Sequence, residues 1–169
     1  MSSANDIFTA IRSMLIDSVD YSAYPTNTIK YGYQTPLQNN IITYWMINSR
    51  KTGITGVDDY DSNLGTRNNL LLFRNLIQVD FYSDDAFIST DNANNFHQYL
   101  TAFGADFLRE NFTGMGMGVV DDIIDNTDPG DKATYLNRYT LRFSMFTHNF
   151  ILRPQIFFDE IIVKPDLIA

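Results

Sequence analysis

The chain contains few residues whose types and spacing could do chemistry. Asp59, Asp61 and Asn63 have the spacing of the first three oxygen ligands in a calcium-binding loop. Such a loop also requires a glycine at its sixth position and a bidentate glutamate at its twelfth, where this chain has Leu64 and Leu70. We therefore predict a solvated acidic loop here and no metal site.

Three closely spaced glycines, Gly114, Gly116 and Gly118, could cradle a phosphate group. A dinucleotide-binding loop of this kind follows a strand and opens a helix. This run instead follows a predicted helix and leads into a predicted strand. We interpret it as a helix stop with a flexible joint, and we predict no cofactor site.

The two histidines, His97 and His148, could serve as metal ligands or as catalytic bases. Neither has a second ligand at the helical spacing used by zinc proteases. Ser144 and His148 could join an aspartate in a hydrolase triad, but no nucleophile elbow surrounds the serine. We expect no enzymatic activity. A hydrolase stays an alternative, and it would need a pocket in which one histidine has a perturbed pKa.

The elements that would position such groups are clearest in residues 70–108. Apolar residues alternate along the first part, which predicts a strand with one buried face and one wet or partnered face. From Ala86 the apolar spacing becomes three, four or seven, which predicts an amphipathic helix lying across the apolar face. Its apolar stripe comprises Ala86, Ala93, Phe96, Leu100, Phe103 and Phe107. Ser83 is the expected N-cap. Asp84 and Asp85 would follow in the first turn, where the helix dipole favours carboxylates.

The remaining elements follow from periodicity and from breakers such as proline and glycine. They are a first helix capped by Asn5, an extended aromatic arm at about 21–40, a strand at 41–48, an exposed loop at about 50–69, and strands at 119–124, 134–148 and 156–163, with breaks at Asn149 and Pro154. The order α-β-β-α-β-β-β predicts a single α+β domain over residues 1–169. Its sheet is mainly antiparallel or mixed, with the long amphipathic helix packed on one face.

Composition narrows the class of function. The formal charge of −8, from 12 basic and 20 acidic residues, argues against nucleic-acid binding by phosphate neutralisation. The chain has no cysteine, no signal-peptide pattern and no apolar run long enough to span a bilayer, so we expect a soluble, intracellular protein without a membrane partner. Its 13 Phe and 10 Tyr suggest a surface that meets protein partners, although a core location would also account for most of these rings.

An ordered set of sequence phrases resembles the tail terminator (neck terminator) proteins of tailed bacteriophages. The phrases are NLIQVDFY at 75–82 followed by SDDA at 83–86, YLNRYTL at 135–141, a break near Asn149, and PQIFFDEI at 154–161. The resemblance covers roughly residues 40 to 164. It implies a structural protein without catalytic residues, metals or cofactors.

The resemblance also implies a place in the virion, at the neck on top of the tail, for a protein made in the host cytoplasm. Such a subunit forms a homo-oligomeric ring, usually hexameric. The ring caps the tail tube protein, meets the last ring of sheath protein if the tail is contractile, and joins the head-completion or connector protein. DNA would pass through the lumen without specific binding, and the net negative charge suits such a wall.

Partner contacts are expected in the aromatic arm and in the acidic loop, because both are long and polar or aromatic. The candidate residues are Tyr24, Tyr31 and Tyr33 in the arm, and Asp58, Asp59, Tyr60 and Asp61 in the loop. Two alternatives remain open. One is a monomeric binding module or assembly chaperone, and the other is a different head-tail joining protein or a tail-tube protein.

Overall fold

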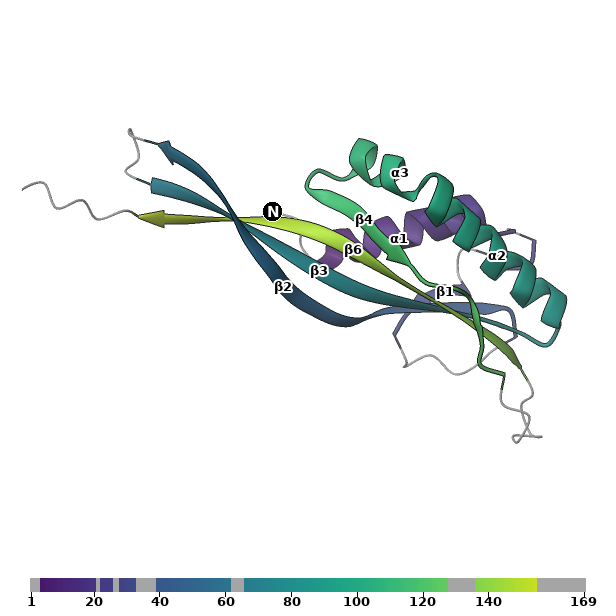
Figure 1. Cartoon of the computed structure of the whole chain (residues 1–169). Helices are drawn as coiled ribbons and strands as arrows, with labels where there is room; N and C mark the ends of the chain where they lie inside the picture. The colour runs from purple at the N-terminus through teal and green to yellow at the C-terminus, as the bar shows by residue number, and fades with distance from the viewer. Residues whose placement is uncertain are drawn as a thin grey trace, which may run out of the picture.

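The structure, a computed structural model, describes residues 4–20, 22–25, 28–32, 39–61, 66–127 and 136–154. Within these ranges the helices and strands are α1 (Ala4–Ser18), β1 (Ile29–Tyr31), β2 (Ile41–Asp61), β3 (Thr66–Ser83), α2 (Ala86–Ala102), α3 (Gly104–Asn111), β4 (Met115–Val120), β5 (Ile124–Asp125) and β6 (Asn137–Pro154) (Figure 1). One mixed sheet with helices confirms the predicted α+β class. None of the described helices has the length and apolar character that a membrane crossing requires.

The strands form one sheet in the order β1-β2-β3-β6-β4, and β5 also pairs with β6. β1 runs parallel to β2, whereas the other pairings are antiparallel. β3 lies at the centre and is paired along its whole length, with β2 on one side and β6 on the other. These three strands therefore form a long ribbon, and Figure 1 shows it running well past the helices.

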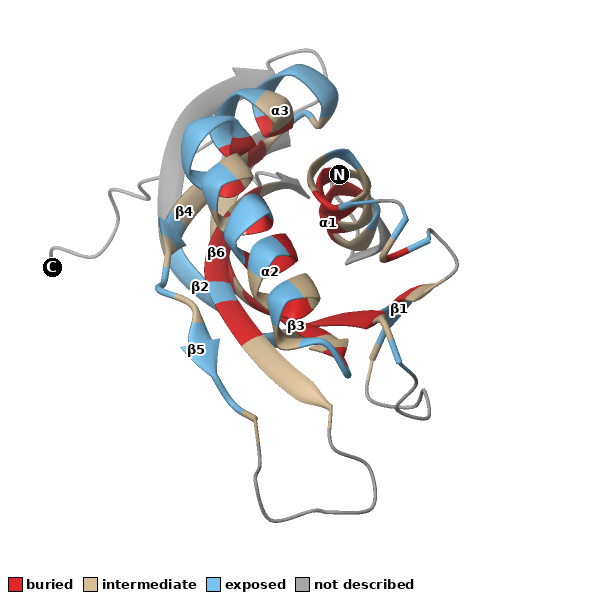
Figure 2. Ribbon diagram, turned by 90° about the vertical axis from the view of Figure 1, so that its right-hand side faces the viewer, coloured by how far each residue is buried: buried red, intermediate tan, exposed pale blue. Residues whose placement is uncertain are grey.

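The helices cover one face of the sheet, and the hydrophobic core lies between these two layers (Figure 2). The ring of Phe96 in α2 occupies the middle of the core, 6.1 Å from the Phe81 ring of β3 and 5.9 Å from the Phe143 ring of β6. Helix α1 adds Ile11, Met14 and Leu15, all fully buried. The alternation along β3 is confirmed, because Ile77, Val79 and Phe81 face this core.

The start of α2 differs from the prediction at its cap. Asp85 is the N-cap, and its Oδ1 accepts the backbone N–H of Phe87 at 2.8 Å. Ser83, the predicted cap, ends β3 instead, where its hydroxyl donates to Asn40 Oδ1 and accepts the N–H of Asp85. The acidic corner thus precedes the helix. A carboxylate there still lies at the positive end of the helix dipole.

The single long helix of the prediction is divided at Phe103, whose φ of −125° leaves the helical range. Gly104 follows, packed so closely on β4 that an added Cβ would lie 2.7 Å from Met117 Cε. The break lets α3 turn and bury Leu108. Phe103, expected in the apolar stripe, is instead 61% exposed.

The largest difference lies in residues 50–69, which the sequence predicts as an exposed loop. β2 continues to Asp61 and β3 begins at Thr66, so most of this segment is a strand pair. β6 likewise runs through Asn149, where a break was expected, and ends at Pro154. Both corrections have one cause: each strand continues because β3 supplies its backbone hydrogen bonds, which local composition does not reveal.

Smaller differences concern the first helix, the aromatic arm and the glycine run. α1 begins at Ala4, so the predicted cap Asn5 lies inside it. β1 lies within the predicted arm at 21–40. Gly114, with a φ of 77°, lies in the turn after α3, which already ends at Asn111. Gly116 and Gly118 belong to β4, before the predicted strand start at residue 119. The predicted strand at 156–163 lies outside the described residues.

Candidate functional site

The ribbon formed by β2, β3 and β6 continues beyond the last pairing with β4. We call this part the sheet extension, and it comprises residues 53–61 of β2, 66–72 of β3 and 148–154 of β6. Figure 1 shows it projecting from the end of the molecule that the helices leave uncovered. Within the described residues no layer covers these three strands, which makes them a natural surface for contacts with another protein.

The extension has two outer edges, and neither is paired within the described part of the chain. On the β2 side, β1 pairs only with residues 42–44. On the β6 side, pairing to β4 ends at Thr147, and the last outward bond is the N–H of His148, which donates to the Gly114 carbonyl at 2.9 Å. Open strand edges readily accept another strand. Sequence reasoning missed these edges because it assigned the segment to a loop.

The direction of the free backbone groups on β6 follows from that last bond. Residues of one parity point their backbone groups toward one neighbouring strand, and residues of the other parity point toward the opposite one. The backbone N–H of His148 points away from β3, and the pairing register of β6 with β3 stays regular as far as Pro154. The backbone N–H groups of Phe150 and Leu152 therefore face the open edge, while that of Ile151 faces β3.

The candidate contact residues of the aromatic arm separate in the structure. Tyr24 is fully buried, and its hydroxyl donates to the Tyr82 carbonyl at 3.1 Å, so it belongs to the core and is not a partner contact. Burial raises the pKa of the Tyr24 hydroxyl. Tyr31 is 55% exposed and rests on Phe8, with ring centroids 4.2 Å apart. Tyr33 lies outside the described residues.

The acidic candidates Asp58, Asp59, Tyr60 and Asp61 lie on the last part of β2. Asp61 pairs with Thr66 where β2 and β3 meet at the tip of the sheet extension. The backbone therefore places this group at the far end of the extension. Tyr31 lies on β1, which pairs with the opposite end of β2. The two sets of predicted contacts do not form one site.

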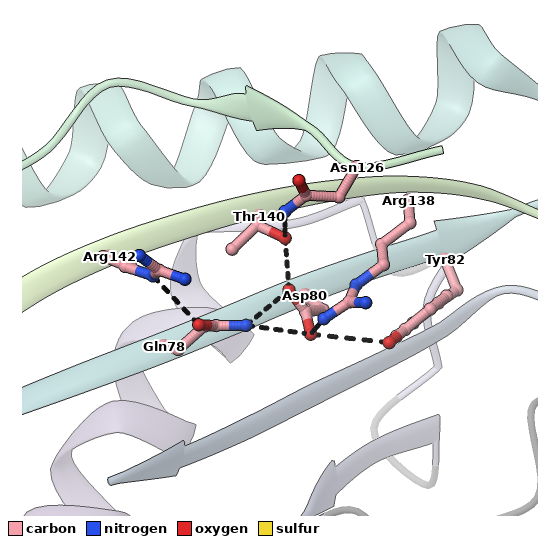
Figure 3. A network of polar contacts seen from close by, with 7 residues as sticks. All are labelled: Gln78, Asp80, Tyr82, Asn126, Arg138, Thr140 and Arg142. Carbon is pink, nitrogen blue, oxygen red and sulfur yellow. Dashed lines mark hydrogen bonds and ion pairs between the residues drawn. The ribbon is translucent and has the colours of Figure 1, made fainter. Parts of the chain in front are cut away.

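The helix-free face of the sheet carries a polar network centred on Asp80 (Figure 3). This carboxylate is fully buried. It accepts the Thr140 hydroxyl at 2.5 Å, an Arg138 guanidinium N–H at 2.8 Å, the Gln78 amide at 3.2 Å and the Tyr82 hydroxyl at 3.4 Å.

Two further contacts extend the network to its rim. Arg142 donates to Gln78 Oε1 at 3.0 Å, and Asn126 donates to the Thr140 hydroxyl at 2.7 Å.

The network fastens β3 to β6 from the side opposite the helices. Arg138 neutralises the buried charge and also lies 5.6 Å from the centre of the Tyr82 ring. Burial, together with the neighbouring Asp80 carboxylate, raises the pKa of Tyr82 to about 12. Each oxygen of Asp80 is occupied by donors from this chain, so the arrangement stabilises the sheet and leaves no free base for catalysis.

The residues considered for catalysis have other roles. Ser144 is buried, and its hydroxyl accepts the backbone N–H of Val119 at 3.0 Å. His148 Nδ1 lies 3.2 Å from the Gly114 carbonyl, and His97 stands on α2 beside a shallow pocket of about 500 Å³ that Asp122 also lines. No group of three His, Asp or Glu side chains suited to a metal ion occurs among the described residues.

Comparison with known proteins gives one informative match. Residues 5–165 match the sequence model of a family described as phage neck terminator protein, which is nearly the whole chain. This confirms the resemblance drawn from the ordered phrases. A search of curated proteins found no match.

Proposed function

Since this chain belongs to the phage neck terminator family, whose members are structural proteins of the bacteriophage virion, we propose that it forms a ring closing the end of the tail. In this proposal the ring caps the tail tube protein, meets the last sheath ring in a contractile tail, and joins the connector on the head side. DNA passes through its lumen. The observation that supports ring formation is the sheet extension with its two open edges.

The two edges are suited to each other in direction. β2 and β6 both run antiparallel to β3, so both run toward the tip of the extension. In a cyclic ring every subunit points the same way, and two different patches meet at each interface. The β6 edge of one copy would therefore meet the β2 edge of the next in parallel, and the sheet would continue from subunit to subunit.

A hexamer built in this way would surround its lumen with a closed wall. Six three-stranded extensions contribute about eighteen strands, and closed barrels of that size enclose an open channel. Closure also removes the exposed edges, which are an aggregation hazard in a single copy. Asp58 to Asp61 would stand at one rim of this wall, where we propose that they contact the tube or the connector.

A proline at Leu152 tests the edge contact. Leu152→Pro removes an N–H that faces the open edge and leaves the bonds to β3 in place, since proline is tolerated on edge strands. We expect a folded single copy in place of the ring, measured by sedimentation velocity and circular dichroism. Leu152→Val is the matched control and should assemble. Ile151→Pro removes a bond to β3 and should destabilise the subunit itself.

The outcomes separate the proposal from its alternatives. Rings from Leu152→Pro as abundant as those of the unmodified chain would refute pairing through the β6 edge. A single copy at every concentration of the unmodified chain would favour the monomeric binding module. Electron microscopy of particles carrying a labelled chain tests the position directly, and label along the tail tube would contradict a terminator.

A further inference from the structure

We infer that a contact between opposite charges joins neighbouring subunits of the ring: the acidic segment Asp121–Asp125 of one copy docks against Arg50 and Arg74 of the next. This inference rests on the proposed ring and identifies the contact that selects its neighbours. Its basis is a pair of arginines at the root of the sheet extension that have no ion-pair partner among the described residues, together with acidic residues at the opposite side of the same sheet.

Arg50 and Arg74 stand directly opposite each other on β2 and β3. Both are exposed, and both line a surface pocket of about 430 Å³ with Asn48, Thr52 and Leu76. The ion pairs found among the described residues involve neither of them. Like charges directly opposite in a sheet repel, so this pair costs stability unless an anion lies between the two guanidinium groups.

Basic residues are concentrated on this side of the sheet. Lys51 is exposed on β2, and Lys30 is exposed on β1, the strand next to β2. The described residues 28–32 and 39–52, which form this side, contain no acidic residue. A chain with a net charge of −8 therefore presents a locally basic edge.

The opposite side of the sheet has the complementary character. Residues 115–127 contain Asp121, Asp122 and Asp125 and no lysine or arginine. All three aspartates are exposed, and none appears in the ion pairs of the described chain. β4 and β5 lie beyond β6, at the other end of the strand order from β1 and β2.

A cyclic ring brings these two sides together. If the β6 edge of one extension faces the β2 edge of the next, then β4 and β5 of the first body face β1 and β2 of the second. A carboxylate from residues 121–125 can accept hydrogen bonds from the guanidinium groups of Arg50 and Arg74. The carboxylate attracts both guanidinium groups and offsets the repulsion between them. Two basic edges, or two acidic edges, repel each other, which disfavours wrong pairings of subunits.

The phosphate backbone of DNA is the competing occupant. The observations favour carboxylate because the basic edge has a matching acidic edge on the same molecule. Two arginines in one pocket also neutralise few phosphates, whereas affinity for DNA depends on neutralising many phosphates along its backbone.

Charge reversal tests the contact. Arg50→Glu with Arg74→Glu should raise the concentration for half-assembly by at least about tenfold, because like charges then face each other. Asp121→Lys with Asp122→Lys should do the same. The chain carrying all four changes should assemble again, within about threefold of the unmodified chain. Arg109→Glu, on exposed α3, is the control for net charge and should assemble normally. Sedimentation velocity measures each distribution.

The results distinguish this inference from the ring itself. If the unmodified chain forms rings and the reversed variants form them equally well, the charge contact is wrong and the ring stands. If the four-fold variant is not rescued, the two patches do not meet. If the unmodified chain never assembles, both the ring and the contact fail. A labelled DNA duplex is the last probe. Loss of its binding in Arg50→Glu with Arg74→Glu, with rings intact, would assign the pocket to phosphate.

Discussion

The Asp80 network allows a stability prediction with a defined magnitude. Thr140 donates its hydroxyl to Asp80 Oδ1 at 2.5 Å, and both side chains are fully buried. Thr140→Val keeps the shape of the side chain and removes this donor. It also removes the acceptor of the Asn126 amide, but Asn126 is exposed and its amide can bind water instead. A hydrogen bond to a charged group contributes about 1.5–3 kcal/mol, and Arg138 and Gln78 still bind the carboxylate after the change. We therefore expect the free energy of unfolding to fall by about 2 kcal/mol.

Urea unfolding is the suitable assay, read by the fluorescence of Trp45 and by circular dichroism. With an m-value of about 2 kcal/mol per molar urea, the midpoint should fall by about 1 M at unchanged m. Protein concentration must be held fixed, because ring assembly would add to the apparent stability. Thr101→Val makes the same chemical change on the exposed face of α2, and its effect should stay within about 0.5 kcal/mol.

A double-mutant cycle isolates the charge. In an Asp80→Asn background the lost bond is between neutral groups, so Thr140→Val should cost only about 1 kcal/mol. An equal cost in both backgrounds would show that the carboxylate does not strengthen this bond. A cost below about 0.5 kcal/mol in the unmodified chain would refute the reasoning altogether, because a buried charge would then have lost a donor without consequence.

Two further predictions concern β4 and alkaline pH. An alanine side chain at Gly118 would lie 3.0 Å from the Ser144 carbonyl, so Gly118→Ala should lower the free energy of unfolding by about 1–3 kcal/mol. Gly116→Ala in the same strand is the control, because its side chain meets nothing within 4 Å. Equal unfolding midpoints for the two variants would contradict this prediction. Burial raises the pKa of Tyr82 from 10.0 to about 12, so the folded chain keeps a proton that the unfolded chain loses. The free energy of unfolding should therefore fall between about pH 10 and pH 12. Tyr82→Phe should make that fall shallower in urea titrations, and an unchanged slope would count against this assignment.

The sequence by itself determined the class of fold and the faces of its main elements. Alternation at Ile77, Val79 and Phe81 predicted the buried face of β3, and the stripe through Phe96 and Leu100 predicted the face of the helix. These inferences succeed because local periodicity reports which side chains must leave water. The ordered phrases also indicated the correct family, because they can be recognised in the sequence without any three-dimensional information.

The tertiary structure decided what depends on distant partners. Residues 50–61 are strand because β3 pairs with them, and Tyr24 is buried because it packs beneath Phe81, with ring centroids 6.4 Å apart. Asp80 acquires a structural role only when β6 brings Arg138 and Thr140 beside it. Local composition contains none of this, since hydrogen bonds and ion pairs between residues far apart in the chain form only after the strands align.

The cross-strand pairing of Arg50 with Arg74 also depends on the tertiary structure. The register of β2 on β3 shifts between Met46 and Asn48 and again between Lys51 and Gly53. Such an irregularity changes which side chains of two strands face each other. The amino-acid sequence supplies the two positive charges, but only the folded register places them opposite each other on β2 and β3.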